Sequence, residues 1–409
     1  MQKNHPFFGT IFTSLWSEHF QKNSIFEYKF IDPVQFVRHK YLPIYHNVGR
    51  NITNGIYYNL NQSGQDYKGK AFLIYDVLSD KMPQEDIEVP AGLSVKRVRQ
   101  YKGYLSSLEG FGGFEDYFAN QFSSKSRTNL RKYLKRLDTN FNTEFKVFHG
   151  KISKEEYDVH FGKMLDLIEK RFEELELENN ILRLQDYYYD LCYKMILNKE
   201  ASLNVLYVNE EPAAISFCFL SPERAYFAIT TFDTDFRRYN LGHVLIMKIM
   251  EWCFDNNIKE FDYSKGTYDY KTRWSNKFYY FENHILYDKT SLKALFYGNL
   301  FYYFFRVKQF LRDIEFNKLY SRIKFFLKKK ETKSETIDIQ ELDTADFDKN
   351  KYQEISISEK PHSNVKSVVY DLAFSKPQKV EDIKVYANSE KSHYFIQGKG
   401  ISKKVVFTA

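Results

Sequence analysis

Residues 224–274 decide the fold of this chain, and they read RAYFAITTFDTDFRRYNLGHVLIMKIMEWCFDNNIKEFDYSKGTYDYKTRW. An apolar segment at 226–231 predicts a strand, and a polar loop follows it. From Leu245 to Cys253, apolar residues recur at spacings of three and four, which predicts a helix. A second short apolar run at 258–263 predicts another strand. The stretch is therefore expected to fold as strand, glycine-bearing turn, helix and strand.

The turn in this unit has the features of an anion-binding loop. Amide groups at the start of a helix have no partner inside the helix, and the helix dipole adds partial positive charge there. Asn and Gly tolerate the backbone conformations that a close approach to a ligand requires. We therefore predict that the loop holds a diphosphate, with two arginines adding charge and a histidine as a neighbour of the anion. The residues are Arg237, Arg238, Asn240, Leu241, Gly242 and His243.

The loop resembles the acyl-CoA-binding core of the GNAT acetyltransferase superfamily, in which it reads Arg/Gln-x-x-Gly-x-Gly/Ala. This chain has Arg237-x-x-Asn240-x-Gly242, with asparagine in place of the first glycine. The sequel Phe261-Asp262-Tyr263-x-x-Gly266-x-x-x-Tyr270-Lys271-x-x-Trp274 is similar to the CelD/BioF-like subgroup, whose members are relatives of the FemABX transferases. The resemblance covers roughly residues 122–287. It implies an α/β GNAT fold, which is a mixed, mostly antiparallel sheet flanked by helices, and acetyl-CoA as the cofactor.

Side chains after the second predicted strand are the candidates for catalysis. Acyl transfer to an amine requires removal of a proton from the amine, a donor to the oxyanion, and a proton or cation for the leaving thiolate. Asp262 is either a base, directly or through water, or a structural partner of the loop. Tyr268 or Tyr270 is a candidate proton donor, and Lys271 either stabilises negative charge or is an ordinary surface lysine. By the resemblance, the oxyanion donor is a backbone N–H of the strand at 226–231.

A basic helix is predicted at residues 124–137, SKSRTNLRKYLKRL, because one face is apolar and Ser123 or Ser124 can cap it. Its cations form either a solvated face or an anion site at the entrance of the cleft, suited to a sugar-nucleotide phosphate or an acidic glycan. The CelD/BioF-like subgroup often begins a helix with S-K-x-R-x-N-L-R at this place. The candidate substrate-binding residues are Lys125, Arg127, Arg131 and Trp274, and Trp274 is also expected to anchor its loop in the core.

The segments between these elements complete the expected order. A strand is predicted at 141–148, a capping box Ser153-x-x-Glu156 opens a long helix, and another helix runs from 185 to about 197. Alternating runs at 203–208 and 213–220 predict a hairpin. Two helices followed by three antiparallel strands is the order that the GNAT resemblance requires. A last strand is expected at 278–287.

Composition bounds the classes of protein to which the chain belongs. Hydrophobic residues make up 43% of 409 residues, which permits a sizeable core and two domains. The net charge of +7 suits anionic small molecules or a lipid surface and is too diffuse for nucleic acid. The sequence has no zinc spacing, Ser-His-Asp pattern or Walker loop, so no metal is expected. Because no signal-peptide pattern or long apolar span is visible, and Cys192, Cys218 and Cys253 lie in apolar segments, we expect a cytoplasmic protein with reduced cysteines.

Five segments are expected along the chain. Short runs at 368–374, 383–386 and 405–407 suggest a small β-rich tail, and the charged stretch before it reads as a linker. The basic aromatic segment is either a soluble helix packed on the core or an interfacial helix on the inner face of an anionic membrane. The segments are a mixed α/β, degenerate GNAT-like region at 1–118 with a hinge at 110–113, a GNAT catalytic domain at 119–290, the basic aromatic helix at 291–330, the linker at 331–362 and the tail at 363–409.

The sequence therefore predicts an acyl-CoA-dependent N-acyltransferase with acetyl-CoA as the donor. By the resemblance, the expected acceptor is the amine of an amino sugar or of a cell-envelope polysaccharide precursor. One alternative is a FemABX-like aminoacyl transferase that uses aminoacyl-tRNA, which would need no CoA and a more basic surface. Another is a non-catalytic GNAT-like module that binds a partner or a membrane through residues 291–330.

Overall fold

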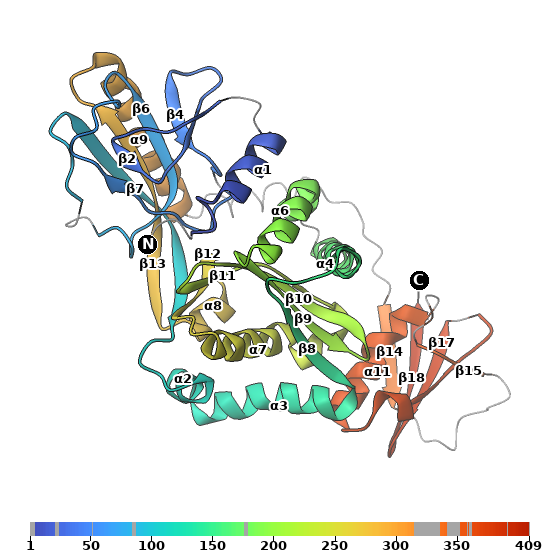
Figure 1. The fold of residues 1–409 in the computed structure, drawn as a ribbon. Coiled ribbons are helices and arrows are strands. Elements are labelled where there is room, and N and C mark those ends of the chain that lie inside the picture. The colour runs from blue at the N-terminus through green and yellow to red at the C-terminus, as the bar shows by residue number, and fades with distance from the viewer. Residues whose placement is uncertain are drawn as a thin grey trace.

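The computed structural model describes residues 5–20, 24–50, 52–83, 87–175, 179–314, 336–341, 352–357, 359, 362–390 and 392–408. Their centre is an 11-stranded sheet in the order β1-β3-β4-β6-β13-β7-β12-β11-β10-β9-β8. Most neighbouring strands are antiparallel, and helices flank the sheet (Figure 1). The expected α/β fold with a mixed, mostly antiparallel sheet is confirmed.

The first part of the chain forms one end of this sheet. β4 pairs with β6 in parallel, with Ile44 opposite Ala71, while β2 and β5 form a separate two-stranded sheet. The burial of all eight residues of β6 marks it as a central strand. The elements are α1 (Thr10–Phe20), β1 (Ile25–Phe26), β2 (Ile31–Asp32), β3 (Phe36–Arg38), β4 (Ile44–Asn47), β5 (Asn59–Leu60), β6 (Ala71–Leu78) and β7 (Leu93–Ser107).

Two long strands join the two halves of the sheet. β13 (Lys277–Asp288) lies between β6 and β7 and pairs antiparallel with both. The far end of β7 pairs with β12, with Ser107 opposite Glu260. Figure 1 shows β7 and β13 running side by side from the first half into the second. The predicted hinge at 110–113 follows β7, where Gly110 has a φ of 86°.

The second half follows the predicted order of elements. Ser123 caps α3, and Ser153 and Glu156 form the expected capping box of α4. β9, β10 and β11 are consecutive antiparallel strands. The elements are α2 (Phe114–Gln121), α3 (Ser124–Asn140), β8 (Thr143–Phe148), α4 (Lys154–Glu174), α5 (Asn180–Arg183), α6 (Gln185–Leu197), β9 (Ala201–Val208), β10 (Glu211–Leu220), β11 (Arg224–Phe232), the 3₁₀ helix η3 (Thr234–Tyr239), α7 (Leu241–Asp255), β12 (Glu260–Lys265), α8 (Asp269–Trp274) and α9 (Leu292–Asp313).

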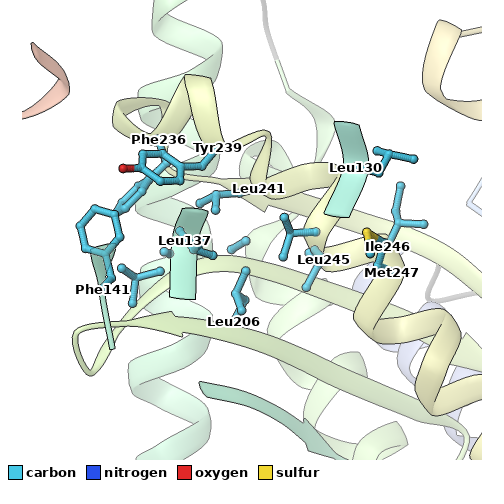
Figure 2. Packing of buried hydrophobic residues seen from close by; sticks show 14 of the residues in the cluster. Leu130, Leu137, Phe141, Leu206, Phe236, Tyr239, Leu241, Leu245, Ile246 and Met247 are labelled. Atoms are coloured by element: carbon cyan, nitrogen blue, oxygen red, sulfur yellow. The ribbon is translucent and has the colours of Figure 1, made fainter. Parts of the chain in front are cut away.

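A hydrophobic cluster fixes α7 against the sheet and α3. Figure 2 shows Leu137 of α3, Leu241 and Leu245 of α7, and Leu206 of β9 gathered in this cluster. All four are at most 2% exposed, and burying such a side chain stabilises the fold by about 1.5–3 kcal/mol. The start of α7 is therefore held rigidly near the end of β11.

The described part of the C-terminal unit is a five-stranded sheet with the helices α11 and η7, and it differs from the predicted tail. The run at 368–374 lies in α11, because Val365, Val369 and Leu372 are buried at helical spacing. β14 and β15 lie inside the expected linker. The elements are β14 (Thr336–Glu341), β15 (Gln353–Ile355), α11 (Ser363–Ser375), the 3₁₀ helix η7 (Val380–Asp382), β16 (Lys384–Ala387), β17 (His393–Gly398) and β18 (Ile401–Thr408).

The segment after β13 is helical over its first half. α9 ends at Asp313, and residues 315–330 of the predicted basic aromatic helix lie outside the described residues. In the part of the chain that the structure covers, no helix combines the length and apolar character needed to cross a bilayer.

Candidate active site

The candidate site begins where β11 and β12 part. The two strands pair in parallel only from Arg224–Glu260 to Tyr226–Asp262, although β11 continues to Phe232. A bulge in the pairing with β10 gives β11 an extra residue, because Phe227 lies opposite Cys218 and Ile229 opposite Phe217. Such a bulge bends a strand locally. Beyond Tyr226 the edge of β11 that faces β12 has no register partner among the described residues.

Two side chains in this unpaired part of β11 also have unsatisfied groups. The hydroxyl oxygens of Thr230 and Thr231 are buried and have no hydrogen-bond partner among the described residues. Buried polar atoms in native proteins are nearly always hydrogen-bonded to protein, water or a ligand. The free edge of β11 therefore has backbone groups available to a bound molecule, and the hydroxyls of Thr230 and Thr231 lie on opposite faces of the strand.

The N-terminus of α7 lies next to the end of β11. Asn240 has the left-handed conformation that its residue type favours, with φ 49° and ψ 51°, as the sequence predicts. Its carbonyl oxygen accepts from the amides of His243 and Val244. A Cβ atom on Gly242 would lie 3.1 Å from Phe232 Cε1 of β11, so a larger residue would crowd this contact. The two positions have different requirements: a left-handed backbone at Asn240 and close packing at Gly242.

His243 is an uncharged member of this loop. Trp274 Nε1–H donates to His243 Nδ1 at 2.9 Å, and indole nitrogen is only a donor, so the neutral imidazole carries its proton on Nε2. Burial and, secondarily, the charge of Arg273 lower the pKa of His243 to about 4. At neutral pH His243 therefore offers an N–H donor to a neighbouring anion rather than a positive charge.

Trp274 is a core residue, which corrects its assignment to the substrate-binding set. Its side chain is 0% exposed, and its ring stacks beside Phe118 and meets Phe122 edge to face. Its carbonyl oxygen accepts from the hydroxyl groups of Ser106 and Tyr117. These contacts fit the other expectation for Trp274, which is that it anchors α8 in the core.

The Arg238 side chain makes its hydrogen bonds to the C-terminal unit and not at the α7 loop. Its Nη1 donates to Ser375 Oγ at 2.5 Å and to the Asp371 carbonyl oxygen at 3.3 Å, both on α11. Arg237 is exposed, and its carbonyl oxygen accepts from the Asn240 amide. The prediction that both arginines hold an anion therefore needs correction for Arg238, because its guanidinium binds α11.

Two cations that sequence reasoning missed lie near the α7 terminus. The Arg171 guanidinium, in the last turn of α4, lies 4.5 Å from the centre of the Phe232 ring. Arg273 of α8 is close enough to lower the pKa of His243. Neither has a local sequence signal, because the chain brings α4, α8 and the end of β11 together only in the folded protein.

Two of the arginines predicted to bind an anion on α3 contact α2 and the residue that follows it. Arg127 Nη1 donates to the carbonyl oxygens of Ala119 and Phe122, at 2.8 and 2.9 Å. Arg131 forms an ion pair with Glu115 and lies 5.4 Å from the centre of the Phe118 ring. Lys125 is exposed on the first turn. Because both arginines hold α2 against α3, the structure gives them a structural role.

A charge cluster around the buried Arg224 lies where β11 and β12 are still paired, at the closed end of the opening. Arg224 forms ion pairs with Asp80, Glu260 and Asp262, at 2.6, 2.6 and 3.3 Å. Asp262 is 0% exposed and also accepts from the Tyr279 hydroxyl and the Ser264 amide. Burial raises the pKa of Asp262 to about 6, although the Arg224 charge opposes this rise. The Ser264 contact is the structural bond to the loop that the sequence offered as one reading of Asp262.

Lys271 is buried, so the reading of it as a surface lysine is wrong. It is 5% exposed, and Nζ donates to the Lys265 carbonyl oxygen at 2.5 Å. Its Nζ also lies 5.4 Å from the centre of the Tyr268 ring. Burial lowers the pKa of Lys271 to about 8, against the attraction of the Asp262 charge. A lysine that titrates near neutral pH can act either as a cation or as a base.

Tyr270 precedes Lys271 on α8, and its ring lies 6.3 Å from that of Tyr268. Burial raises the pKa of its hydroxyl to about 12, with a smaller effect from Tyr268, while the Arg171 charge lowers it. The phenol is therefore protonated at neutral pH. A protonated phenol is the form that an acid catalyst requires.

Within the described ranges no group of three or more His, Cys, Asp or Glu side chains has the geometry to hold a metal ion. The three cysteines are free and buried, as their apolar sequence context predicts.

Comparison with known families assigns the part of the chain that contains this site. The family model described as "Acetyltransferase (GNAT) domain" matches residues 124–272, from the start of α3 into α8. The match includes β11, the α7 loop and β12. Residues 124–272 of this chain are therefore similar to a GNAT acetyltransferase domain.

Solved structures match parts of this chain at 10–12% sequence identity and with TM-scores below 0.5. A conserved protein of unknown function from Bacteroides thetaiotaomicron has 10% identity and a TM-score of 0.46, over 70% of this chain and 92% of that one. L-PGS from Bacillus licheniformis has 12% identity and a TM-score of 0.44, over 73% and 97%. FemX has 11% identity and a TM-score of 0.43, over 61% and 83%. No curated protein sequence matches the chain. At these values the similarities do not identify a substrate.

Proposed function

We propose that this protein is an N-acyltransferase that takes its acyl group, as acetyl, from CoA. One observation carries the proposal: β11 and β12 part after Tyr226 and Asp262, and the start of α7 lies at the end of the opened strand. An extended chain can bind the unpaired edge of β11 through strand-type hydrogen bonds. A diphosphate can bind the amides at the start of α7.

The residues present fit a CoA-type ligand. The free edge of β11 supplies polar groups for an amide-containing arm, and one of the unpartnered hydroxyls of Thr230 and Thr231, which lie on opposite faces of the strand, adds a side-chain group. The amides of Leu241 and Gly242, the His243 Nε2–H and the Arg237 side chain would hold the diphosphate. Bound acetyl-CoA supplies an activated thioester, which is the chemistry that these residues would use.

Each candidate catalytic residue has a role that agrees with its surroundings. A backbone N–H of β11 beyond Tyr226 is the proposed donor to the oxyanion, since it has no partner in β12. Tyr270 is protonated at neutral pH and is the proposed donor to the leaving sulfur. The Lys271 ammonium is proposed to stabilise negative charge that develops near the loop. Asp262 remains the candidate base, with Arg224 and Tyr279 fixing its position.

The acceptor is proposed to be the amine of an amino sugar or of a cell-envelope polysaccharide precursor. This part of the proposal rests on the resemblance of residues 261–274 to the CelD/BioF-like subgroup. An aminoacyl transferase that uses aminoacyl-tRNA would share the GNAT fold but would have no use for CoA. Binding of CoA therefore separates these two functions.

Isothermal titration calorimetry with CoA and acetyl-CoA tests the proposal directly. We expect one molecule to bind per chain, because β11 and β12 form the one parallel pair in the described sheet that a helix connects. A thermal-shift screen with UDP-amino sugars, with and without acetyl-CoA, then identifies the acceptor class. Absence of heat and of thermal stabilisation with both CoA compounds would rule out the cofactor and, with it, the proposed reaction.

A further inference from the structure

The outer face of α9 exposes a continuous apolar surface. The helix packs on the sheet through Ala294, Gly298 and Phe305, and a Cβ on Gly298 would lie 2.3 Å from Tyr287 Cδ1. Its opposite face carries ten of the twenty large hydrophobic side chains that are exposed in the described residues, with exposures between 38% and 86%. This face consists of Leu292, Leu295, Phe296, Leu300, Tyr303, Phe304, Val307, Phe310, Leu311 and Ile314.

The apolar face of α9 is long enough to contact an extended surface. A helix of 22 residues is about 33 Å long, and the apolar positions recur along its whole length. Exposed apolar patches of this extent mark binding sites for proteins or membranes. The helix is not apolar enough to cross a bilayer, so its expected position is in the plane of an interface.

A basic groove lies between α9 and β7, beside the apolar face. It consists of two adjoining pockets of about 330 and 450 Å³. No ion pair within the described residues involves any of its five cations, and Asp313 is its one lining acid. Several of the cations lie over aromatic rings, such as Arg312 over Tyr101 at 3.9 Å and Lys102 over Phe278 at 3.9 Å. The five are Arg97, Arg99, Lys102, Arg306 and Arg312.

The groove therefore has positive charge that no ion pair of the described residues neutralises, and Arg97 is the one of the five whose Nη1 donates to a backbone carbonyl oxygen, that of Met82. Arg312 Nη1 donates a hydrogen bond to Gln309 Oε1, and Gln309 Nε2 donates one to Asp313 Oδ1. The Asp313 carboxylate is therefore hydrogen-bonded to an amide and is not paired with a cation. The pKa of Lys308 on the same helix is lowered, by burial first and then by the charges of Arg312 and Arg50. Several uncompensated cations in one groove favour a phosphate-bearing ligand.

Charge also decides between a membrane and a second copy of this chain as the occupant. A symmetric dimer places the same patch of each copy against the other. Such a dimer through α9 would bring two sets of these cations together with few acids between them. An anionic lipid surface satisfies both features, because acyl chains cover the apolar face and headgroup phosphates meet the arginines.

We propose that the outer face of α9 docks on an anionic phospholipid membrane and that the groove between α9 and β7 receives headgroup phosphates. The groove ends at Gly266 and Thr267, which lead into α8 with Tyr270 and Lys271. For the proposed acyltransferase, on which this one consequence rests, an acceptor held at the membrane surface would lie on the same side as the catalytic loop. Docking itself requires no catalytic activity.

Co-sedimentation of the full chain with vesicles tests the docking. One vesicle set is phosphatidylcholine alone, and the other also contains phosphatidylglycerol. We expect at least about tenfold stronger partitioning onto the anionic vesicles, and weaker binding at high salt, since each nearby cation contributes to the attraction. The double variant Phe304→Ser, Phe310→Ser should lower binding to the anionic vesicles by about tenfold or more, because it removes apolar area from the exposed face.

Variants of the groove and matched controls complete the experiment. Arg99→Gln combined with Arg306→Gln should remove most of the preference for anionic lipid and leave the unfolding temperature unchanged. Val159→Ser, on the exposed face of α4, and Lys194→Gln, on α6, are the controls that should bind as the unmodified chain does. Equal partitioning onto both vesicle types, or none, overturns the proposal. A dimer in sedimentation velocity that the Phe304→Ser, Phe310→Ser variant dissociates, without vesicle binding, identifies a second copy as the occupant instead.

CoA calorimetry on the same preparations separates this proposal from the proposed function. Vesicle binding with no CoA binding would support docking and reject the acyltransferase. CoA binding with no vesicle binding would reject docking and leave the acyltransferase supported.

Discussion

The sheet contains two parallel strand pairs, β4 with β6 in the first half and β11 with β12 in the second, and they differ in the segment that connects the paired strands. Each pair has three registered positions, Ile44–His46 with Ala71–Leu73 and Arg224–Tyr226 with Glu260–Asp262. In the second half, η3 and α7 connect the strands, and the start of α7 packs against Phe232 at the end of β11. In the first half the described connection contains only turns and β5, without an α-helix.

The chain itself fills the opening in the first half. Ile56 forms an isolated parallel bridge with Val77 of β6. Its amide donates to the Asp76 carbonyl oxygen, and its carbonyl oxygen accepts from the Leu78 amide, both at 2.9 Å. No equivalent segment pairs with β11 beyond Tyr226 among the described residues. A parallel pair that parts therefore becomes a ligand site only where the connection supplies a helix terminus and leaves the edge free. The degenerate GNAT-like character expected for residues 1–118 stays a prediction.

The largest expected effect concerns Arg224, which ties the two halves together at the foot of the second opening. Its partner Asp80 follows β6, whereas Glu260 and Asp262 belong to β12. Arg224→Met would leave the buried Asp262 carboxylate without its cation and should lower the free energy of unfolding by about 3–5 kcal/mol. Urea denaturation measures the loss. The control Lys259→Met breaks the exposed pair with Glu223 and should cost less than about 1 kcal/mol. Similar small losses in both variants would mean that the cluster does not join the halves.

Lys271 tests whether the second half is catalytic. If its ammonium stabilises the transition state, Lys271→Ala should lower turnover by about 10²-fold with little change in KM. Lys271→Arg should rescue turnover only partly, because a planar guanidinium places its charge differently. Steady-state kinetics with the acceptor found by thermal shift gives both numbers. Turnover of Lys271→Ala close to that of the unmodified chain would remove the lysine from the mechanism.

The pH profile determines which form of Lys271 acts. Since the pKa of this lysine is about 8, a role for the ammonium predicts that the rate falls as pH rises through about 8. Lys271→Arg should lose this decrease, because a guanidinium stays charged across the range. A rate that instead rises through about 8 would identify the neutral amine as a base.

Gly242 tests the helix terminus that the first half lacks. Gly242→Val adds a branched side chain against Phe232, where even a Cβ lies at 3.1 Å, and should raise the dissociation constant for acetyl-CoA by about tenfold. Calorimetry measures the change. Gly162→Val on α4, where a Cβ meets nothing within 4 Å, is the matched control and should leave affinity unchanged. An unchanged affinity for Gly242→Val would separate the α7 terminus from the cofactor.

The smallest expected effect distinguishes the two loop arginines. Arg237→Ala removes an exposed cation and should weaken acetyl-CoA binding severalfold, by roughly 1 kcal/mol. Arg238→Ala should change the affinity less than about twofold, because its guanidinium binds α11. The opposite order in calorimetry would show that Arg238 leaves α11 when the cofactor binds.

Local sequence signals predicted the second half well. The left-handed Asn240, the Ser153–Glu156 capping box and the periodicity of α7 each depend on residues within one or two turns of chain. The first half was not predictable in this way. Its strands are short, and its central neighbour β13 comes from about 200 residues later in the chain.

Four candidate binding residues make structural contacts for one shared physical reason. Arg127, Arg131, Arg238 and Trp274 have the residue types and spacing of binding groups, but their partners lie on α2, α11 and other elements that fold against them. Sequence indicates that a cation or a ring is present at a position. It does not indicate which distant carbonyl oxygen, carboxylate or ring will contact that side chain.

The position of β13 has a consequence for the synthesis of this protein. β6 and β7 are consecutive in the chain, yet the strand that lies between them ends at Asp288. A ribosome adds about 5–20 residues per second, so β6 is complete roughly 10–40 s before its neighbour has emerged. During that interval the facing edges of β6 and β7 are open to pairing with other nascent chains. The first half therefore cannot finish folding before the second half has been made, and a chain that ends before β13 is expected to aggregate.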